Sequence, residues 1–443
     1  MSQPSPVAER DLTAAEPDPT AKQVNSEKKT DSEPVKPTAH FAALHAQIAE
    51  ALSIAEFGVP VTAQPESQSG VLIETSRNRL TLSTFDFWTA VSVSVPVETP
   101  VAKGYSLLHF AQLKKALAAM AAGETKAVAA RTPVSLAGDL LATEHITVPI
   151  TALDIHAFTH PPEAVPAMAT MDAQTFLAQL NRVLTTAGRD DTLPTLTGVQ
   201  MTLDGGTLTM AATDRYRFAV AEVTAGATIQ PPEKPLTALI PAGVLAPLAK
   251  RLKAYNGPMG IGIIEDGDGT TARATLSMGD TTVTMRPLEG ELPRYKSLFP
   301  TECDTSVQVD RATLVRAAKK CQALISAKGE KGSPVSFAWG DDGALTLAPR
   351  IGTADDQART KGMTIPATIT HGSADTVRGN ILSHNPAFLL DALGTFSGDT
   401  ITLHIRGMEE GQTTKPVLLT GGPDIAGDGY RHLLMPVRID LTR

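Results

Sequence analysis

Apolar residues recur with helical spacing in six stretches of the chain. In residues 172–189 they fall on one face behind Asp172, a residue type that caps helix starts; they are Phe176, Leu177, Leu180, Val183 and Leu184. Helices are likewise predicted at 41–55, 106–121, 242–254, 310–326 and 386–396. Pro247 lies inside one of them, where it either kinks the helix or marks a later start.

Alternating apolar positions between these helices predict strands, and one strand pair recurs along the chain. Residues 70–86 align without a gap on residues 198–214, and both read as strand, tight turn and strand, with turns at 76–78 and 204–206. A third copy at 335–347 needs one extra turn residue. The unit of helix, hairpin, helix and further strands therefore occurs three times, which predicts three domains of one architecture.

Proline-rich and turn-rich segments set the domain limits. Pro161, Pro162 and Pro166 separate the first two units, and residues 300–304 precede the third. We predict domains at 39–161, 162–300 and 301–443, the first being the most divergent. Residues 1–38 hold six prolines and no aromatic residue, so they are predicted to be a disordered tail, either a solvated extension or a tether.

Composition excludes several classes of protein. Cys303 and Cys321 have no CxxC or nearby Cys/His partner, which argues against a disulfide scaffold or a structural zinc and suits a reducing cytosol. The longest apolar stretch, 236–249, is too short for a membrane span and is broken by prolines. A cytoplasmic location without a membrane partner is expected.

The chain lacks the common catalytic motifs. It has no phosphate-binding loop, dinucleotide fingerprint, zinc-protease motif or nucleophile elbow. Asp86 and Asp214 occupy equivalent repeat positions and read as turn caps rather than as paired carboxylates. The Asp- and Gly-rich segment 265–270 reads as a hairpin turn rather than a calcium loop. We therefore predict no catalytic residue, no metal site and no cofactor; an enzyme would need clustered carboxylates with a metal.

Charge is distributed unevenly along the chain. The net charge is −8, yet the six helical stretches together carry +7 and the remainder −15. This segregation indicates a cationic helical face turned toward a polyanion, and the lack of interleaved aromatic residues favours duplex phosphates over single strands; the alternative is a solvated face. The candidate DNA-facing residues are Lys114, Lys115, Arg182, Lys250, Arg251, Lys253, Arg316, Lys319 and Lys320.

Four segments together resemble a known family. They are 196–199, then 212–220 with the pattern A-T-D-x-x-R-x-A-V, then 292–300, and 430–439, which contains L-M-P-V-R. In this order they resemble the bacterial DNA sliding clamp, the beta subunit of DNA polymerase III. The resemblance covers residues 160–443 directly and 40–160 only through the repeat. It implies an α+β fold of three clamp domains, with helices lining a ring and antiparallel sheets outside.

The resemblance also implies function. A head-to-tail homodimer would encircle duplex DNA without reading sequence, and would tether the polymerase III catalytic subunit and the clamp loader through short clamp-binding peptides, giving processivity without catalysis. Carried over by motif, the partner-peptide pocket comprises Leu196, Thr213, Arg215, Tyr216, Arg217, Phe218, Pro293, Leu298, Leu433, Leu434, Met435, Pro436, Val437 and Arg438. For the apolar members the alternative is plain core packing. Leu324 and Ile325 are implied at the dimer interface, with packing inside their own domain as the alternative.

The chain departs from the family pattern near this pocket. Arg215 stands where the family has a small residue, Leu193 where an arginine is common, and Ser297 where some members have a base. Residues 440–443 extend past the usual end and could crowd the groove. Alternative functions are therefore a divergent paralogue acting as an accessory or inhibitor-tolerant clamp, or a protein-interaction scaffold that does not encircle DNA.

Overall fold

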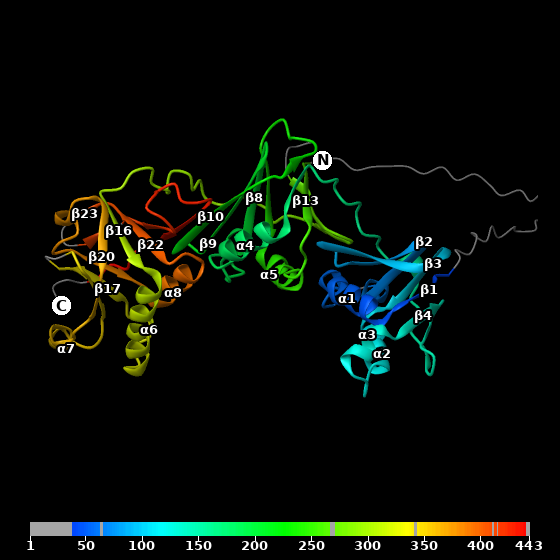
Figure 1. Cartoon of the computed structure of the whole chain (residues 1–443). Helices are drawn as coiled ribbons and strands as arrows, with labels where there is room; N and C mark the ends of the chain where they lie inside the picture. The colour runs from blue at the N-terminus through cyan, green and yellow to red at the C-terminus, as the bar shows by residue number, and fades with distance from the viewer. Residues whose placement is uncertain are drawn as a thin grey trace, which may run out of the picture. The chain divides into compact units, whose positions relative to one another are not determined.

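The computed structural model describes residues 38–62, 65–265, 271–340, 343–409, 412–413 and 415–439 (Figure 1). Of the predicted tail only Thr38 is described, and of the turn at 265–270 only Glu265; the extension 440–443 lies outside the described residues. Among the helices of the described part, none is long and apolar enough to cross a membrane.

Each predicted helical stretch contains a helix, and these helices contact one another in three pairs. The pairs are α1 (His45–Ala55) with α2 (Phe110–Met120), α4 (Ala173–Leu184) with α5 (Ala242–Arg251), and α6 (Arg311–Ala327) with α8 (Pro386–Gly394). Further short helices, absent from the prediction, are α3 (Lys126–Arg131) and α7 (Ala354–Arg359), with 3-10 turns at Glu56–Gly58, Glu66–Ser69, Ile155–Ala157, Pro194–Thr197 and Ala374–Thr376.

The helix starts follow their capping residues. The Asp172 and Asp310 carboxylates cap α4 and α6, each accepting a 2.7 Å hydrogen bond from the backbone amide three residues on. The predicted start of the first helix at residue 41 is wrong, because His40–Leu44 form strand β1, whose backbone pairs with Pro133–Ala137. Helix α5 runs through Pro247 and ends at Arg251, three residues before its predicted end.

The strands of the described residues form four sheets, in which neighbouring strands pair antiparallel except β21 with β24. In spatial order, the four-stranded sheet is β1 (His40–Leu44), β4 (Pro133–Ala137), β5 (Leu140–Ala142) and β6 (Thr147–Pro149). The seven-stranded sheet is β11 (Ala227–Thr228), β7 (Ala169–Asp172), β13 (Pro258–Glu265), β14 (Thr271–Met278), β15 (Thr281–Met285), β3 (Thr89–His109) and β2 (Gly70–Phe85).

The strands of the other two sheets lie between residues 198 and 434. The nine-stranded sheet is β12 (Leu236–Pro241), β8 (Gly198–Asp204), β9 (Thr207–Thr213), β10 (Arg217–Thr224), β26 (Tyr430–Leu434), β25 (Val417–Thr420), β22 (Thr400–Ile405), β16 (Thr305–Asp310) and β20 (Ala367–Gly372). The six-stranded sheet is β19 (Met363–Ile365), β18 (Leu345–Pro349), β17 (Val335–Trp339), β21 (Ile381–His384), β24 (Gln412–Thr413) and β23 (Met408–Glu409).

The predicted repeat is visible in the strand pairing. The second and third copies are the hairpins β8–β9 and β17–β18, whose turns contain Gly205 and Gly343 with positive φ. In the first copy, residues 70–85 form the single element β2, but Arg77 has a φ of +52° and the register with β3 shifts on both sides of it. The irregularity therefore falls at the predicted turn, 76–78.

Two sheets cross the predicted domain limits at equivalent strands. The strand after the hairpin in the first unit, at the start of β3, pairs with β15, the last strand of the second unit. In the same way β10 of the second unit pairs with β26, the last strand of the third. The same strand pairing between neighbouring units, which we call a joint, therefore occurs at both domain limits. On this ground we propose 39–161, 162–300 and 301–443 as the domains.

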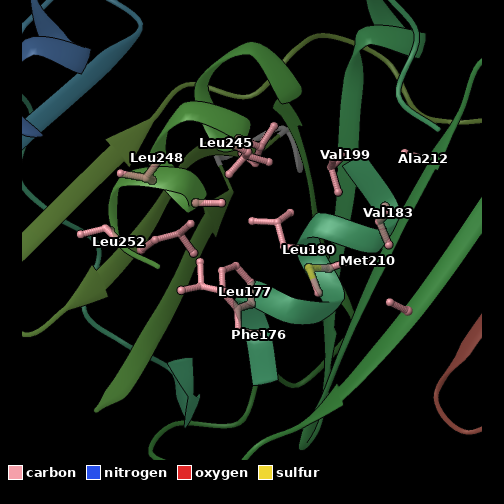
Figure 2. Packing of buried hydrophobic residues seen from close by; sticks show 14 of the residues in the cluster. Phe176, Leu177, Leu180, Val183, Val199, Met210, Ala212, Leu245, Leu248 and Leu252 are labelled. Carbon is pink, nitrogen blue, oxygen red and sulfur yellow. The ribbon is translucent and has the colours of Figure 1, made fainter. Parts of the chain in front are cut away.

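The core of the second unit lies between its two helices and its strands (Figure 2). The α4 stripe predicted from the sequence is buried apart from the partly exposed Leu184. It meets Leu245 and Leu248 of α5 and Val199 and Met210 of the β8–β9 hairpin. Because each such side chain contributes about 1.5–3 kcal/mol when fully buried, this packing fixes the hairpin against the helices.

Candidate functional site

The centre of the candidate site is the tight turn that joins β9 to β10. One oxygen of the Asp214 carboxylate accepts hydrogen bonds from the backbone amides of Tyr216 (3.0 Å) and Arg217 (2.9 Å). The Thr213 hydroxyl donates to the Arg217 carbonyl at 2.7 Å. Arg215 has a φ of +78° and, like Tyr216, an exposed side chain. Asp214 therefore closes a structural turn that presents Arg215 and Tyr216 to solvent.

Arg217 ties this turn to helix α8. Its buried guanidinium donates to the Asp214 carboxylate at 2.9 Å and to Asp391 at 2.8 Å, and lies 4.4 Å from the centre of the Phe388 ring. The Tyr216 ring stacks on the same Phe388, with centroids 5.8 Å apart. Arg217 thus positions the turn and α8 relative to each other rather than facing a ligand.

The C-terminal strand brings a second segment to the turn. Leu434 and Leu433 of β26 lie opposite Arg217 and Phe218 of β10. Beyond the strand, the Met435 amide donates to the Tyr216 carbonyl at 2.9 Å. The Met435 side chain is 37 % exposed beside the exposed Tyr216, so the two predicted segments form one surface.

An aromatic cluster lies beneath this surface. The Phe218 ring centre is 4.9 Å from that of Tyr295 and 5.7 Å from that of Phe299, and burial raises the pKa of the Tyr295 hydroxyl. Leu433 belongs to the same cluster, and Leu196 packs against it. The segment 292–300 therefore supplies the floor through Tyr295 and Phe299, while its Leu298 is 42 % exposed.

The predicted pocket residues fall into three groups by exposure. The buried ones are Thr213, Arg217, Phe218, Leu433 and Leu434; the half-buried ones are Leu196, Pro436 and Val437; the exposed ones are Arg215, Tyr216, Pro293, Leu298, Met435 and Arg438. Leu434 belongs to the large core cluster instead of the aromatic one. The exposed group is the part that a ligand can touch.

Sequence reasoning missed four residues of this site. Tyr295 and Phe299 lie in a segment that had already been singled out, so its aromatic residues were the available signal. Phe388 and Asp391 lie in the predicted helix 386–396, but Asp391 is 174 positions from Arg217 and only the folded chain brings α8 to the turn.

The predicted DNA-facing residues also differ in exposure. Those with exposed side chains are Lys115, Lys250, Lys253, Arg316, Lys319 and Lys320. Lys114 forms a 2.5 Å ion pair with Glu56, and the Arg182 guanidinium lies 5.1 Å from the centre of the Tyr430 ring. Arg251 is exposed but donates to Ser53 of α1, and it lines a cavity of about 570 Å³ shared with Ile54.

The two residues implied at the dimer interface differ in exposure. Leu324 is 52 % exposed on α6, whereas Ile325 is 4 % exposed and packed within its own chain. Only Leu324 is therefore available to a second subunit. Among the described residues, no group of three or more His, Cys, Asp or Glu side chains is placed to hold a metal ion.

Comparisons with known proteins agree with this architecture. Residues 170–294 match the family model of the central domain of the DNA polymerase III beta subunit. The Bacillus subtilis DNA polymerase sliding clamp has the same fold, with a TM-score of 0.72 at 18 % identity over 90 % of this chain and 99 % of that one.

Curated relatives extend the match over nearly the whole described chain. A beta sliding clamp homolog, GriR of Streptomyces muensis, is 27 % identical over 88 % of this chain and 97 % of its own length. The beta sliding clamp of Streptomyces coelicolor is 30 % identical over 404 residues, which are 88 % of this chain and 97 % of that protein. At that identity and coverage, the chain belongs to the family of beta sliding clamps, the beta subunits of DNA polymerase III.

Proposed function

We propose that this chain is a DNA sliding clamp that works as a ring-shaped homodimer around duplex DNA. It would hold the polymerase III catalytic subunit and the clamp loader through short peptides that bind the surface around Tyr216 and Met435. A tethered polymerase meets its template at high effective concentration, so processivity rises without a covalent step. Neither a cofactor nor sequence-specific base contact is needed.

The observation that carries this proposal is the repeated joint between units. In each joint the strand after the hairpin of one unit pairs with the last strand of the next. Two strands are left that this rule would pair with each other. They are β19, which follows the third hairpin, and β6, the last strand of the first unit. Each is an edge strand of its sheet in this chain. A second copy placed head to tail would pair β19 with β6 twice and close a ring.

The charge of the helices supports an encircled duplex. Exposed lysines and arginines lie on or next to one helix of each unit: α2, α5 and α6. Phosphate contacts of this kind bind DNA independently of its sequence. The exposed Leu324 on α6 is the residue we place at the subunit interface.

The surface at the turn supports peptide capture. Its aromatic floor is buried, and three apolar side chains around it are exposed: Tyr216, Leu298 and Met435. Sites of this composition take short peptides that insert apolar side chains.

Retention on DNA tests the ring. The purified chain, loaded by a clamp loader onto nicked circular DNA, should stay on the circle through gel filtration and leave when the circle is cut. Failure to be retained on the circle contradicts encirclement and favours a scaffold role. The solution mass should correspond to two chains.

Peptide binding tests the surface. Tyr216→Ala with Met435→Ala should weaken binding of a polymerase-derived clamp peptide at least tenfold while leaving the dimer mass unchanged. Ile229→Ala, which removes an exposed apolar side chain elsewhere, is the matched control. Equal affinity of the double variant and the control would place the peptide at another surface.

A further inference from the structure

The joint between the first two units contains a second turn of the same construction. One oxygen of the Asp86 carboxylate accepts hydrogen bonds from the backbone amides of Trp88 (2.9 Å) and Thr89 (2.5 Å). Phe87 has a φ of +73°, as Arg215 has +78° in the other turn. The backbone at 86–89 therefore repeats that at 214–217.

The neighbouring strand completes the correspondence. Met285 of β15 lies opposite Thr89, as Leu434 lies opposite Arg217. The next amide, that of Arg286, donates to the Trp88 carbonyl at 2.8 Å, as the Met435 amide donates to Tyr216. Phe87, Trp88 and Arg286 thus occupy the places of Arg215, Tyr216 and Met435.

We define these three residues as the aromatic corner. Phe87 is 44 % exposed and Trp88 58 % exposed, and the exposed Arg286 guanidinium lies 5.0 Å from the centre of the Trp88 ring. Bulky residues with positive φ are strained, and two adjacent exposed aromatic rings leave apolar surface in water. Among the described residues, Arg286 forms no ion pair with an acidic side chain. The two turns also differ in the contact of their central ring: Tyr216 stacks on Phe388, and Trp88 lies against Arg286.

We infer that the aromatic corner is a second peptide-docking surface, for a partner segment that carries a carboxylate next to leucine-like side chains. The unpaired guanidinium supplies the charge complement for the carboxylate, and the two rings supply the apolar contact. Because the backbone conformation is the same as in the turn at 214–217, the guanidinium and the two rings lie on one exposed surface. This surface adds to the proposed function, and its binding does not require that the first surface binds a peptide.

A peptide is favoured over single-stranded nucleic acid as the occupant. Arg286 is the one basic residue between Arg273 and Arg294. A phosphate backbone needs several neighbouring cations, whereas a single guanidinium is enough to pair with one carboxylate of a peptide.

The test uses the full chain with Tyr216→Ala and Met435→Ala, the double variant that weakens the first surface. The probe is a fluorescently labelled peptide of two glutamates followed by three leucines, titrated by anisotropy. Saturable binding is expected. Trp88→Ala should weaken it at least tenfold, and Arg286→Gln two- to fivefold, with the Arg286 effect disappearing for a peptide with glutamines in place of the glutamates.

Two controls keep the result interpretable. Ile229→Ala should bind like the parent, and unchanged circular dichroism of Trp88→Ala shows that the turn variant is folded; if it is not folded, the exposed change Arg286→Gln carries the test. No saturable binding at millimolar peptide, equal affinity of the parent and of the folded Trp88→Ala or Arg286→Gln variant, or binding at the corner of labelled oligothymidylate but not of the peptide would each overturn the inference.

Discussion

Single carboxylates decide where the main helices begin. The Asp310 side chain accepts hydrogen bonds from Thr313, and these hydrogen bonds hold the pKa of Asp310 below its ordinary value. Asp310→Ala should therefore lower the local stability of the first turn of α6. The amides in the first turn of α6 should exchange with deuterium about fivefold faster at pH 7. Asp310→Asn, which keeps an oxygen acceptor, is the control and should stay close to the parent.

The same cap gives a pH dependence with a defined sign. Because the folded pKa is depressed, the part of the stabilisation that depends on the ionised carboxylate is present in full above the unfolded pKa of about 4 and is lost as pH falls through the folded value. The exchange difference between the parent and Asp310→Ala should therefore become smaller below pH ~3. If the exchange difference persists unchanged in acid, the ionised form of the Asp310 carboxylate is not what caps the helix.

Arg217 shows how a buried residue controls an exposed surface. Its guanidinium contacts two carboxylates and one ring, a geometry that a lysine ammonium cannot reproduce. Arg217→Lys should loosen α8 from the turn, reduce affinity for the clamp peptide at least fivefold and speed amide exchange in Pro386–Gly394. Arg294→Lys, an exposed change in the nearby segment, should alter neither. Weaker peptide binding without faster exchange would instead mean that Arg217 contacts the peptide itself.

At the scale of elements, local patterns predicted what local forces determine. The stripe on α4 and its cap Asp172 placed the start of this helix correctly, because both signals lie within a few residues. The start of α1 was wrong because β1 is held by β4, about ninety residues away in the chain, and no local feature marks that pairing. The same reason hid Phe388 and Asp391 from the predicted site. The repeat was predictable because its turn residues and alternation recur in sequence.

Three buried histidines in the strands of the third unit make the stability of that unit depend on pH. Burial lowers the pKa of His384 and of His404 to about 4, and that of His432 to about 3. The unfolded chain takes up protons near pH 6.5 while the folded strands do not, so stability falls as pH decreases from about 7 toward 4. Each group should account for roughly 2 kcal/mol of that loss by pH 5.

The second unit, 162–300, contains no histidine and serves as an internal reference. Exchange mass spectrometry in moderate urea, corrected for the intrinsic effect of pH, should show the third unit losing protection between pH 7 and pH 5 while the second unit changes little. His404→Gln keeps an acceptor and a donor for Ser306 and Thr420, the present partners of the ring, and should reduce the loss. Equal loss of protection in both units would contradict the role of these histidines.

For the whole molecule, side-chain contacts with DNA and encirclement of DNA can be tested separately. Lys319 and Lys320 are exposed on α6 and would lie against phosphates if this helix lines the ring. Replacing both with alanine removes two phosphate contacts, so the slope of log affinity against log salt for a short linear duplex should become about 2 units shallower. Retention on nicked circles should persist, because a closed ring is held by topology.

Lys296→Ala with Lys361→Ala removes the same charge from exposed positions outside the six helices, so it controls for net charge alone. This control should leave the salt slope for the linear duplex unchanged. If both double variants shift the slope equally, DNA responds to the overall charge and α6 does not face it. If the α6 variant also leaves the circle, the contacts themselves hold the protein on DNA, and the closed ring is contradicted.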